Sequence, residues 1–412
     1  SWVQSFDSEY ESFLAYAKLY PDNCILLIDT YDVLKQGLPN AMKIFKEVLE
    51  PLGLTGGVRI DSGDLAYLSK ECRKILDENM ISYVEYSGVK TNPTTDMAYE
   101  CIDLARKNDV DFIVAVGGGS AIDLAKSVAV GLCCNGDVWD FYLGKEIEKA
   151  VEIGVILTIA SSGSESSPNA ILTNNDTLEK MAIESDLIRP VFAIMNPELT
   201  MTLTSYQTAC GITDIIAHCL ERYFTNTENV DLTDRLLESI IKSVIKEGKK
   251  AVFWKDDVES RKNIMWAGSL AHNNIIGCDR EQDWNSHHLE HVLSAKYNCN
   301  HGAGMAVIFP AWMRYVAKKH KAERFAQFAN RVFDIEINND KPIETAMMGI
   351  EKFEDFLEEI KMPLNFVKLG ISDYDIDELV KLNNLNGGKT RGFYSLNEDD
   401  IREIYKIASE NR

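Results

Sequence analysis

Four of the seven histidines of the protein fall within one stretch, WNSHHLEHVLSAKYNCNHGAG. His287 and His291 are four residues apart, so on a helix their side chains lie on the same face. His301 follows ten residues after His291, directly before a Gly-Ala-Gly turn that can fold it back toward that face. Upstream, Asp214 and His218 repeat the spacing of four in a segment that reads as a helix. Imidazole nitrogens and one carboxylate oxygen suit Zn²⁺, Fe²⁺ or a similar divalent ion. The sequence thus predicts one metal site, with His291 beside it, formed by Asp214, His218, His287 and His301.

The short motifs also have a plainer interpretation, because a single D-x-x-x-H on a helix is more often a solvated pair than a ligand pair. The concentration of histidine in a chain so poor in it favours the metal site. His288 points about 100° away from His287 on a helix, so it is not expected to be a ligand. His272 and His320 are interpreted as ordinary surface or core histidines.

The order D-x-x-x-H and then H-x-x-x-H-x9-H-G resembles the signature of the iron-containing alcohol dehydrogenases. The flanking segments DWNSHHLEHVLSAKY and NHGAGMAVIFPAWM are most similar to the butanol-dehydrogenase branch of that family. The resemblance covers about residues 79–412. It implies a metal-dependent oxidoreductase that transfers hydride between NAD or NADP and a primary alcohol or aldehyde such as butanol or butanal. It also implies iron as the metal, with zinc common, His291 as the proton relay, and a homodimer.

A glycine turn lies where an apolar strand passes into a helix, in DFIVAVGGGSAIDLAK. Glycines lack Cβ atoms, so backbone N–H groups can approach an anion at the start of the helix. Tight turns use the same letters, and the motif is not G-x-G-x-x-G. The segment resembles the pyrophosphate-binding turn of the same dehydrogenase family, which implies cofactor contacts from Gly117, Gly118, Gly119, Ser120 and Asp123.

Further cofactor contacts follow from the same resemblance. Relatives usually read T-x-x-A-T-G-S-E where this chain has TIASSGSE, which keeps Thr158 and has Ser162 in place of threonine. A serine-rich loop that caps a helix is the competing interpretation of Ser161 and Ser162. Lys180 matches a position where the family often places a lysine near the cofactor, and Asn92 lies in an Asn-Pro turn before the first helix of this part.

Residues 1–78 resemble a different family from the rest of the chain. SWVQSFDSEYESFLAYAKLYPDNCILLIDTYDVLKQGLPNA and VRIDSGDLAYLSK resemble interior segments of nicotinate phosphoribosyltransferase. That resemblance implies an α/β barrel fragment whose Arg59, Asp61, Ser62 and Asp64 lie near ribosyl and phosphate groups. A barrel core needs all eight strands, so no transferase activity is expected.

The expected organisation has three parts. A barrel fragment at 1–78 precedes an α/β nucleotide-binding part at 79–204, and an all-α metal-binding domain follows at 205–412. No earlier glycine turn precedes residue 79, so the nucleotide-binding part is expected to be an incomplete doubly wound sheet that lacks its first unit. Two alternatives stay open: an inactive fusion that binds metal but not cofactor, and a remnant phosphoribosyltransferase.

Composition limits the classes of partner. The net charge of −21 argues against nucleic acid and anionic membrane surfaces. No apolar run reaches the roughly eighteen residues of a membrane span. The nine cysteines are scattered without a C-x-x-C, which is typical of reduced thiols in a cytoplasmic protein. The expected partner is therefore a small molecule.

Overall fold

The structure is a computed structural model that describes residues 6, 8–21, 24–27, 36, 38–52, 56–59 and 83–410. It divides into two compact units, one made of residues 1–85 with 194–196 and the other made of 86–193 with 197–412. Of the residues expected near ribosyl phosphate, Asp61, Ser62 and Asp64 lie outside the described residues.

The described residues of the first unit include helices α1 and α2, a short π-helix at Phe45–Leu49, a 3-10 turn at Glu50–Leu52 and a pair of parallel strands. Helix α1 (Glu9–Leu19) begins after Ser8, whose hydroxyl accepts a hydrogen bond from the Glu11 N–H. Strand β1 (Cys24–Leu27) pairs in parallel with β2 (Gly56–Arg59), and α2 (Leu38–Ile44) lies between them in the chain. A parallel pair requires such a crossover. The described part of this unit is thus a strand–helix–strand unit, and it does not show the expected barrel fragment.

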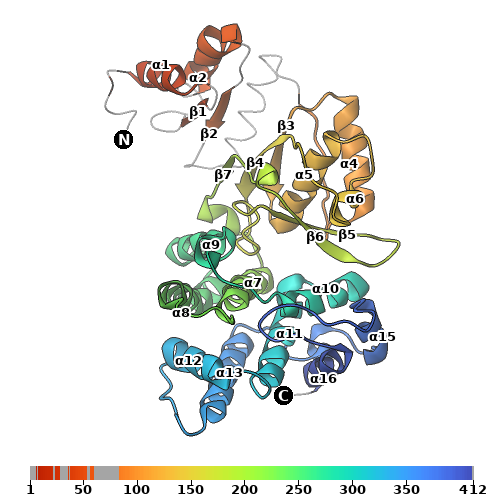
Figure 1. Ribbon diagram of the computed structural model, residues 1–412. Coiled ribbons are helices and arrows are strands. Elements are labelled where there is room, and N and C mark those ends of the chain that lie inside the picture. The colour runs from red at the N-terminus through yellow and green to blue at the C-terminus, as the bar shows by residue number, and fades with distance from the viewer. Residues whose placement is uncertain are drawn as a thin grey trace. The chain divides into compact units, whose positions relative to one another are not determined.

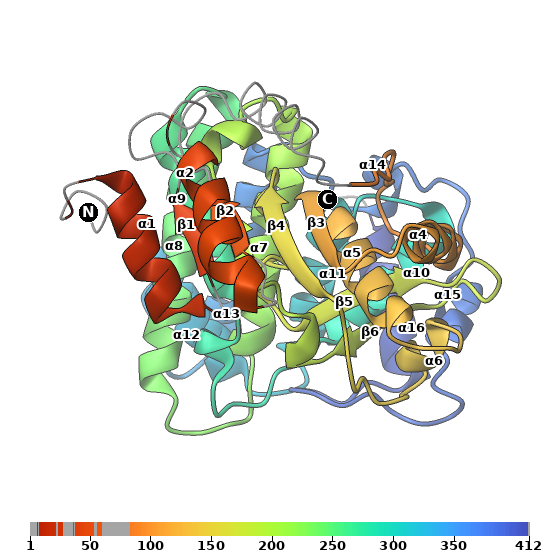
Figure 2. The ribbon, with the colours of Figure 1, turned by 90° about the horizontal axis from the view of Figure 1, so that it is seen from above.

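The second unit begins with an α/β part, whose strands form a sheet of three in the order β3-β4-β7. Strand β3 (Phe112–Gly117) pairs in parallel with β4 (Glu152–Leu157), and β7 (Phe192–Ile194) completes the sheet. Strands β5 (Asn169–Thr173) and β6 (Lys180–Glu184) form a separate antiparallel hairpin. The helices of this part are α4 (Thr95–Lys107), α5 (Gly119–Leu132) and α6 (Trp139–Tyr142). Because α5 follows β3 directly and packs beside β3 and β4 (Figure 2), its first turn lies at the carboxyl end of the sheet.

The rest of the second unit is helical from Ser205 onward (Figure 1), as the three- and four-residue apolar spacing predicts. The longer helices are α7 (Ser205–Tyr223), α8 (Asp231–Phe253), α9 (Val258–His272), α10 (Asn285–Tyr297), α11 (His301–Val316), α12 (Ala322–Phe333), α13 (Pro342–Glu359) and α16 (Glu398–Ser409). Two short helices, α14 (Phe366–Leu369) and α15 (Ile376–Leu382), lie in the connection before α16. Within the described parts of the chain, no helix has the length and apolar character needed to cross a membrane.

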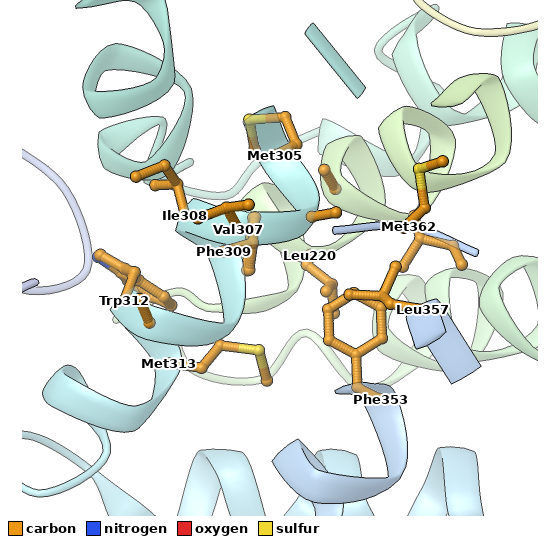
Figure 3. Close-up of a cluster of buried hydrophobic side chains, with 14 of the residues drawn as sticks. Leu220, Met305, Val307, Ile308, Phe309, Trp312, Met313, Phe353, Leu357 and Met362 are labelled. Carbon is orange, nitrogen blue, oxygen red and sulfur yellow. The ribbon is translucent and has the colours of Figure 1, made fainter. Parts of the chain in front are cut away.

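Helix α11 is the centre of the helical core. Its apolar side chains, among them Phe309 and Trp312, belong to one buried cluster with Leu220 of α7 and Phe353 of α13, and Phe309 lies on the side of Leu220 (Figure 3). Trp312 and Leu220 are completely buried. In a close-packed interior of this kind, a change of even one methylene in side-chain volume is felt, so the helices are held firmly against one another. The middle of α7 and the first residue of α11, which carry three of the predicted ligands, are therefore held by a large apolar core.

Candidate active site

Helix α7 carries the first two predicted ligands. Thr204 and Gln207 form a reciprocal capping box that fixes the start of the helix. Asp214 and His218 then lie one turn apart on its buried face, with His218 Nδ1 at 3.7 Å from Asp214 Oδ1. The helix thus presents a carboxylate and an imidazole together, as their spacing predicts.

Helices α10 and α11 bring the other two predicted ligands to the same carboxylate oxygen. His287 lies in the first turn of α10, and its Nε2 is 3.9 Å from Asp214 Oδ1. His301 is the first residue of α11, whose N-cap Asn300 accepts a hydrogen bond from the Gly302 N–H. His301 Nε2 lies 3.4 Å from Asp214 Oδ1. Candidate ligand atoms of Asp214, His287 and His301, from three helices, therefore all lie within 4.8 Å of one another. His218 adjoins this group through Asp214 Oδ1.

The ligand atoms of this cluster are buried and unpaired. Asp214 Oδ1, His218 Nδ1 and His287 Nε2 have no hydrogen-bond partner among the described residues. An unsatisfied buried polar atom is costly, and both nitrogens lie within 4 Å of Asp214 Oδ1, so these residues fit a bound cation. Tetrahedral ligands about 2.0–2.1 Å from a shared Zn²⁺ stand about 3.4 Å apart, and the three histidine nitrogens lie 3.4–3.9 Å from Asp214 Oδ1. Three nitrogens and one oxygen also suit Fe²⁺ or Zn²⁺ chemically.

Two buried carboxylates contact the Nδ1 atoms of His287 and His301, on the side of each ring opposite Asp214. Glu221 Oε1 lies 2.7 Å from His287 Nδ1 and accepts a hydrogen bond from the His287 backbone N–H at 3.1 Å. The Glu290 carboxylate contacts Nδ1 of His301. Each carboxylate holds the proton on Nδ1, which leaves the Nε2 lone pair for a metal. Burial disfavours the charged imidazole of His301, but Glu290 and Asp214 raise the pKa of His301 to about 9.

Sequence reasoning missed both glutamates. Glu221 follows Asp214 by seven residues and His218 by three, so all three lie on one face of α7. That periodicity was a usable signal for Glu221. Glu290 lies three residues after His287 on α10, but its partner His301 is on α11, so its role depends on how the two helices pack.

The remaining histidines lie at different depths. The ring of His291, the predicted proton relay, is half-buried, 5.6 Å from the ring of His301 and 6.4 Å from that of His287. His288 is exposed on α10. His272 was expected to be an ordinary histidine, yet its ring lies 4.3 Å from that of His218 and forms part of the wall of the cluster.

The predicted glycine turn lies between β3 and α5. Gly118 is the N-cap of α5, and among the described residues no side chain caps this helix, so its first N–H groups are available to an anion. A Cβ at Gly118 would lie 2.1 Å from Ile159 Cγ2, and one at Gly119 would lie 2.4 Å from Ser162 Oγ. The Thr158 N–H donates to the Gly117 carbonyl at 2.9 Å. The structure thus brings together Gly117, Gly118, Gly119, Ser120, Thr158 and Ser162.

Asp123 faces the protein interior. Its carboxylate is buried and accepts a hydrogen bond from Ser164 Oγ at 2.6 Å, and burial raises the pKa of Asp123. The neighbouring Lys126 is fully buried, and its Nζ donates to the carbonyls of Ser164, Ser167 and Asn169 at 2.7–2.9 Å. Both side chains therefore fasten the loop at 161–169 to α5.

Asn92 and Lys180 adjoin the metal-binding helices. Lys180 Nζ donates to Asn92 Oδ1 at 3.0 Å and to Ser294 Oγ of α10 at 2.8 Å. Asn92 Nδ2 donates to Asn298 Oδ1 at 3.2 Å and to the Cys299 carbonyl at 3.3 Å, just before His301. A pocket of about 600 Å³ opens beside this contact, lined by Val89, Lys90, Thr91, Tyr206, Asn298, Cys299, Asn300 and Leu369. Its volume is in the range of small-molecule sites.

Comparison with known proteins identifies the family. The model of the iron-containing alcohol dehydrogenases matches residues 39–197, and that of the C-terminal part of the same family matches residues 208–409. NADH-dependent butanol dehydrogenase A of Clostridium acetobutylicum is 36% identical over 334 residues, which are 81% of this chain and 86% of that protein. The NADPH-dependent aldehyde reductase YqhD of Escherichia coli is 32% identical over 332 residues, 79% of this chain and 84% of that protein.

The fold agrees with these matches. The crystal structure of NADH-dependent butanol dehydrogenase A from Thermotoga maritima superimposes with a TM-score of 0.80 at 32% identity, and the match covers 94% of this chain and 97% of that one. The family match begins at residue 39, well before the expected start at 79, and no comparison supports a nicotinate phosphoribosyltransferase fragment at 1–78. The chain therefore belongs to the iron-containing alcohol dehydrogenase family, and it is a metal-dependent alcohol or aldehyde oxidoreductase that uses a nicotinamide cofactor.

Proposed function

We propose that the chain interconverts primary alcohols and aldehydes of about the size of butanol and butanal. The single observation that carries the proposal is the grouping of Asp214, His287 and His301, whose candidate ligand atoms all lie within 4.8 Å of one another. The metal ligands are Asp214, His218, His287 and His301, and the ion is Fe²⁺, with Zn²⁺ as the alternative. The names of the butanol dehydrogenase relatives support the substrate class.

The chemistry divides between the ion and the side chains around it. A divalent ion held here supplies a Lewis acid that lowers the pKa of a substrate hydroxyl. Glu221 and Glu290 hold Nδ1 of His287 and His301, so the Nε2 atoms face Asp214 and are the atoms at which an ion would replace a proton. His291 is half-buried beside His301, and it moves the hydroxyl proton between the substrate and solvent.

The nicotinamide cofactor, NAD or NADP, binds along the edge that carries the glycine turn. The uncapped first turn of α5 holds the pyrophosphate, and the hydroxyls of Ser120, Thr158 and Ser162 lie near that turn. Lys180 and Asn92 form the part of the binding surface that adjoins α10. Asp123 supports the turn from the interior through Ser164.

The proposed organisation keeps a nucleotide-binding domain at 79–204 and a helical metal-binding domain at 205–412, preceded by a separate segment at 1–78. The start of α7 at Ser205 supports the second boundary, and the end of the first compact unit at Glu85 lies close to the first. The family match from residue 39 and the parallel β1–β2 pair support a strand–helix–strand unit ahead of the glycine turn. A homodimer in the cytoplasm completes the proposal.

The test is tryptophan-excited energy transfer to NADH and NADPH titrated into the iron-reconstituted protein. Trp284 is a suitable donor, because its ring lies 5.0 Å from that of His287. We expect saturable binding, its loss in Gly118→Asp, and its retention in Gly136→Asp, which adds the same charge at an exposed glycine. Butanal reduction should follow the same pattern. Retention of one metal ion per chain without any cofactor binding would overturn the proposed function.

A further inference from the structure

The two carboxylate oxygens of Asp214 have different surroundings. Oδ2 accepts a hydrogen bond from the hydroxyl of Ser161 at 2.7 Å. Oδ1 has no hydrogen-bond partner among the described residues, and it faces nitrogen atoms of His218, His287 and His301. One oxygen is therefore occupied by the protein, and the other is left for a ligand.

Ser161 is held in place by its loop and by α7. A Cβ at Gly211 would lie 2.2 Å from the Ala160 carbonyl oxygen, so the chain before Ser161 packs directly on the backbone of α7. On the other side, Gly163 has φ +66°, and a Cβ there would lie 2.7 Å from the Gly268 carbonyl oxygen of α9. The loop is thus pressed between two helices at the residues that flank Ser161.

Hydrogen bonds hold the rest of the loop to α5 and again to α9. Lys126 of α5 donates from its fully buried Nζ to the carbonyls of Ser164 and Ser167. The Glu165 carboxylate is hydrogen-bonded to the hydroxyl of Ser269 on α9. These contacts are all between protein groups, so they hold the loop in the position in which the Ser161 hydroxyl donates to Asp214.

We propose that Ser161 is a positioning residue that makes Asp214 a one-oxygen metal ligand. This inference rests on the proposed metal site. A hydrogen bond to Oδ2 lowers the electron density that this oxygen can offer to a cation and fixes the rotation of the carboxylate. The protein then supplies four donor atoms, and a further position stays open for the substrate oxygen. Without the hydroxyl, Oδ2 is free to turn toward the ion, and the coordination number rises.

The substitution Ser161→Ala should preserve the fold, because the family pattern T-x-x-A-T-G-S-E has alanine at this position. Wild type and Ser161→Ala are to be loaded with Co²⁺ in place of the native ion, and the visible absorption per bound Co²⁺ is to be recorded without substrate or cofactor. Co²⁺ with four or five ligands absorbs more strongly than six-coordinate Co²⁺, because it lacks a centre of symmetry. Ser166→Ala is the matched control, since its hydroxyl is in the same loop but donates to the carbonyls of Gly163 and Ser269.

We expect Ser161→Ala to show weaker absorption per Co²⁺ and an affinity about 10- to 100-fold lower, as is usual when a partner of a metal ligand is removed. Ser166→Ala should match the wild type in both measurements. An unchanged Co²⁺ spectrum in Ser161→Ala would overturn the inference while leaving the proposed function intact. A wild-type protein that takes up no Co²⁺, Fe²⁺ or Zn²⁺ would overturn the metal site and this inference together.

Discussion

Nδ1 of His301, the first residue of α11, contacts the carboxylate of Glu290 on α10, and both residues belong to the cluster around Asp214. Glu290 is completely buried. Burial favours its neutral form, but the charge of His301 and the ammonium of Lys180 lower the pKa of Glu290 below its usual value. A buried carboxylate in this position orients the imidazole and increases its basicity toward a metal.

The substitution Glu290→Gln should therefore weaken metal binding about 10- to 100-fold, because the amide has the same shape but no charge. Equilibrium dialysis against Zn²⁺ and Fe²⁺ measures the change. Glu378→Gln is the control, since Glu378 is exposed on α15 and pairs with Lys296. Equal metal affinity in Glu290→Gln and in the control would show that Glu290 has no role in orienting His301.

The close approach of α11 to α7 depends on Gly302. A Cβ at this position would lie 2.1 Å from the Cys210 carbonyl oxygen and 2.8 Å from Cys210 Cα, and backbone atoms cannot move aside. We expect Gly302→Ala to lower the free energy of unfolding by about 1–3 kcal/mol, the usual cost of overpacking. Urea unfolding measures the loss, and metal affinity should fall too, because His301 is the adjacent residue.

Gly136→Ala serves as the control for this prediction. A Cβ there meets only the ends of the Lys145 and Asp140 side chains, at 3.3 and 3.5 Å, and these can move. The control should change the free energy of unfolding by no more than about 0.5 kcal/mol. An equally small change in Gly302→Ala would mean that the two helices can separate without cost.

The pairing of Asp214 with His218 on one helix face and the helical domain could be predicted from the sequence because their geometry is local. A spacing of four residues puts Asp214 and His218 on one face of any helix, whatever packs against it. The partners of the ligands could not be predicted in the same way. Glu290 meets His301 only because α10 and α11 pack side by side, and Ser161 meets Asp214 only because Gly211 admits its loop.

Two further differences have the same origin. Asp123 follows the glycine turn in sequence, and the family resemblance implies a cofactor contact for it, but its carboxylate lies on the face of α5 that the loop at 161–169 covers. Residues 1–78 contain short segments that resemble another enzyme, yet the family match begins at residue 39. The resemblance of short sequence segments does not fix a domain boundary, because strand–helix–strand units occur in barrels and in doubly wound sheets alike.

His291 should be required for turnover and not for metal binding. Its ring lies 5.6 Å from that of His301, near enough for a proton relay beside the ligands. We expect His291→Asn to lower kcat about 100-fold or more, which is a usual contribution of a positioned acid or base. Steady-state butanal reduction measures the loss, with metal content measured on the same sample. His288→Asn, at the exposed neighbouring position, should retain activity, and full activity in His291→Asn would exclude it as the relay.

Acid stability should depend on Asp234, which is buried between two arginines. Burial raises its pKa, but hydrogen bonds from Arg324 and Arg280 lower the pKa of Asp234 below its ordinary value of 3.8. A carboxyl group with a lowered folded-state pKa contributes stability that is fully present above its ordinary pKa and is lost as the pH falls through the folded value. Asp234→Asn should cost about 3–5 kcal/mol at pH 7, because it leaves the charge of Arg280 buried and unpaired.

The decisive measurement is the pH dependence of that cost. The free energy of unfolding of wild type and Asp234→Asn is to be measured with urea at pH 7, 5, 4 and 3. The difference between the two should be constant down to about pH 4 and smaller below it. Below that pH the unfolded wild-type chain binds a proton at Asp234 that the folded protein does not bind, and this lowers the stability of the wild type alone. Asp231→Asn is the control, because Asp231 is exposed at the start of the same helix and pairs with Arg331. A difference that stays constant to pH 3 would mean that the carboxylate is not stabilised by the two arginines.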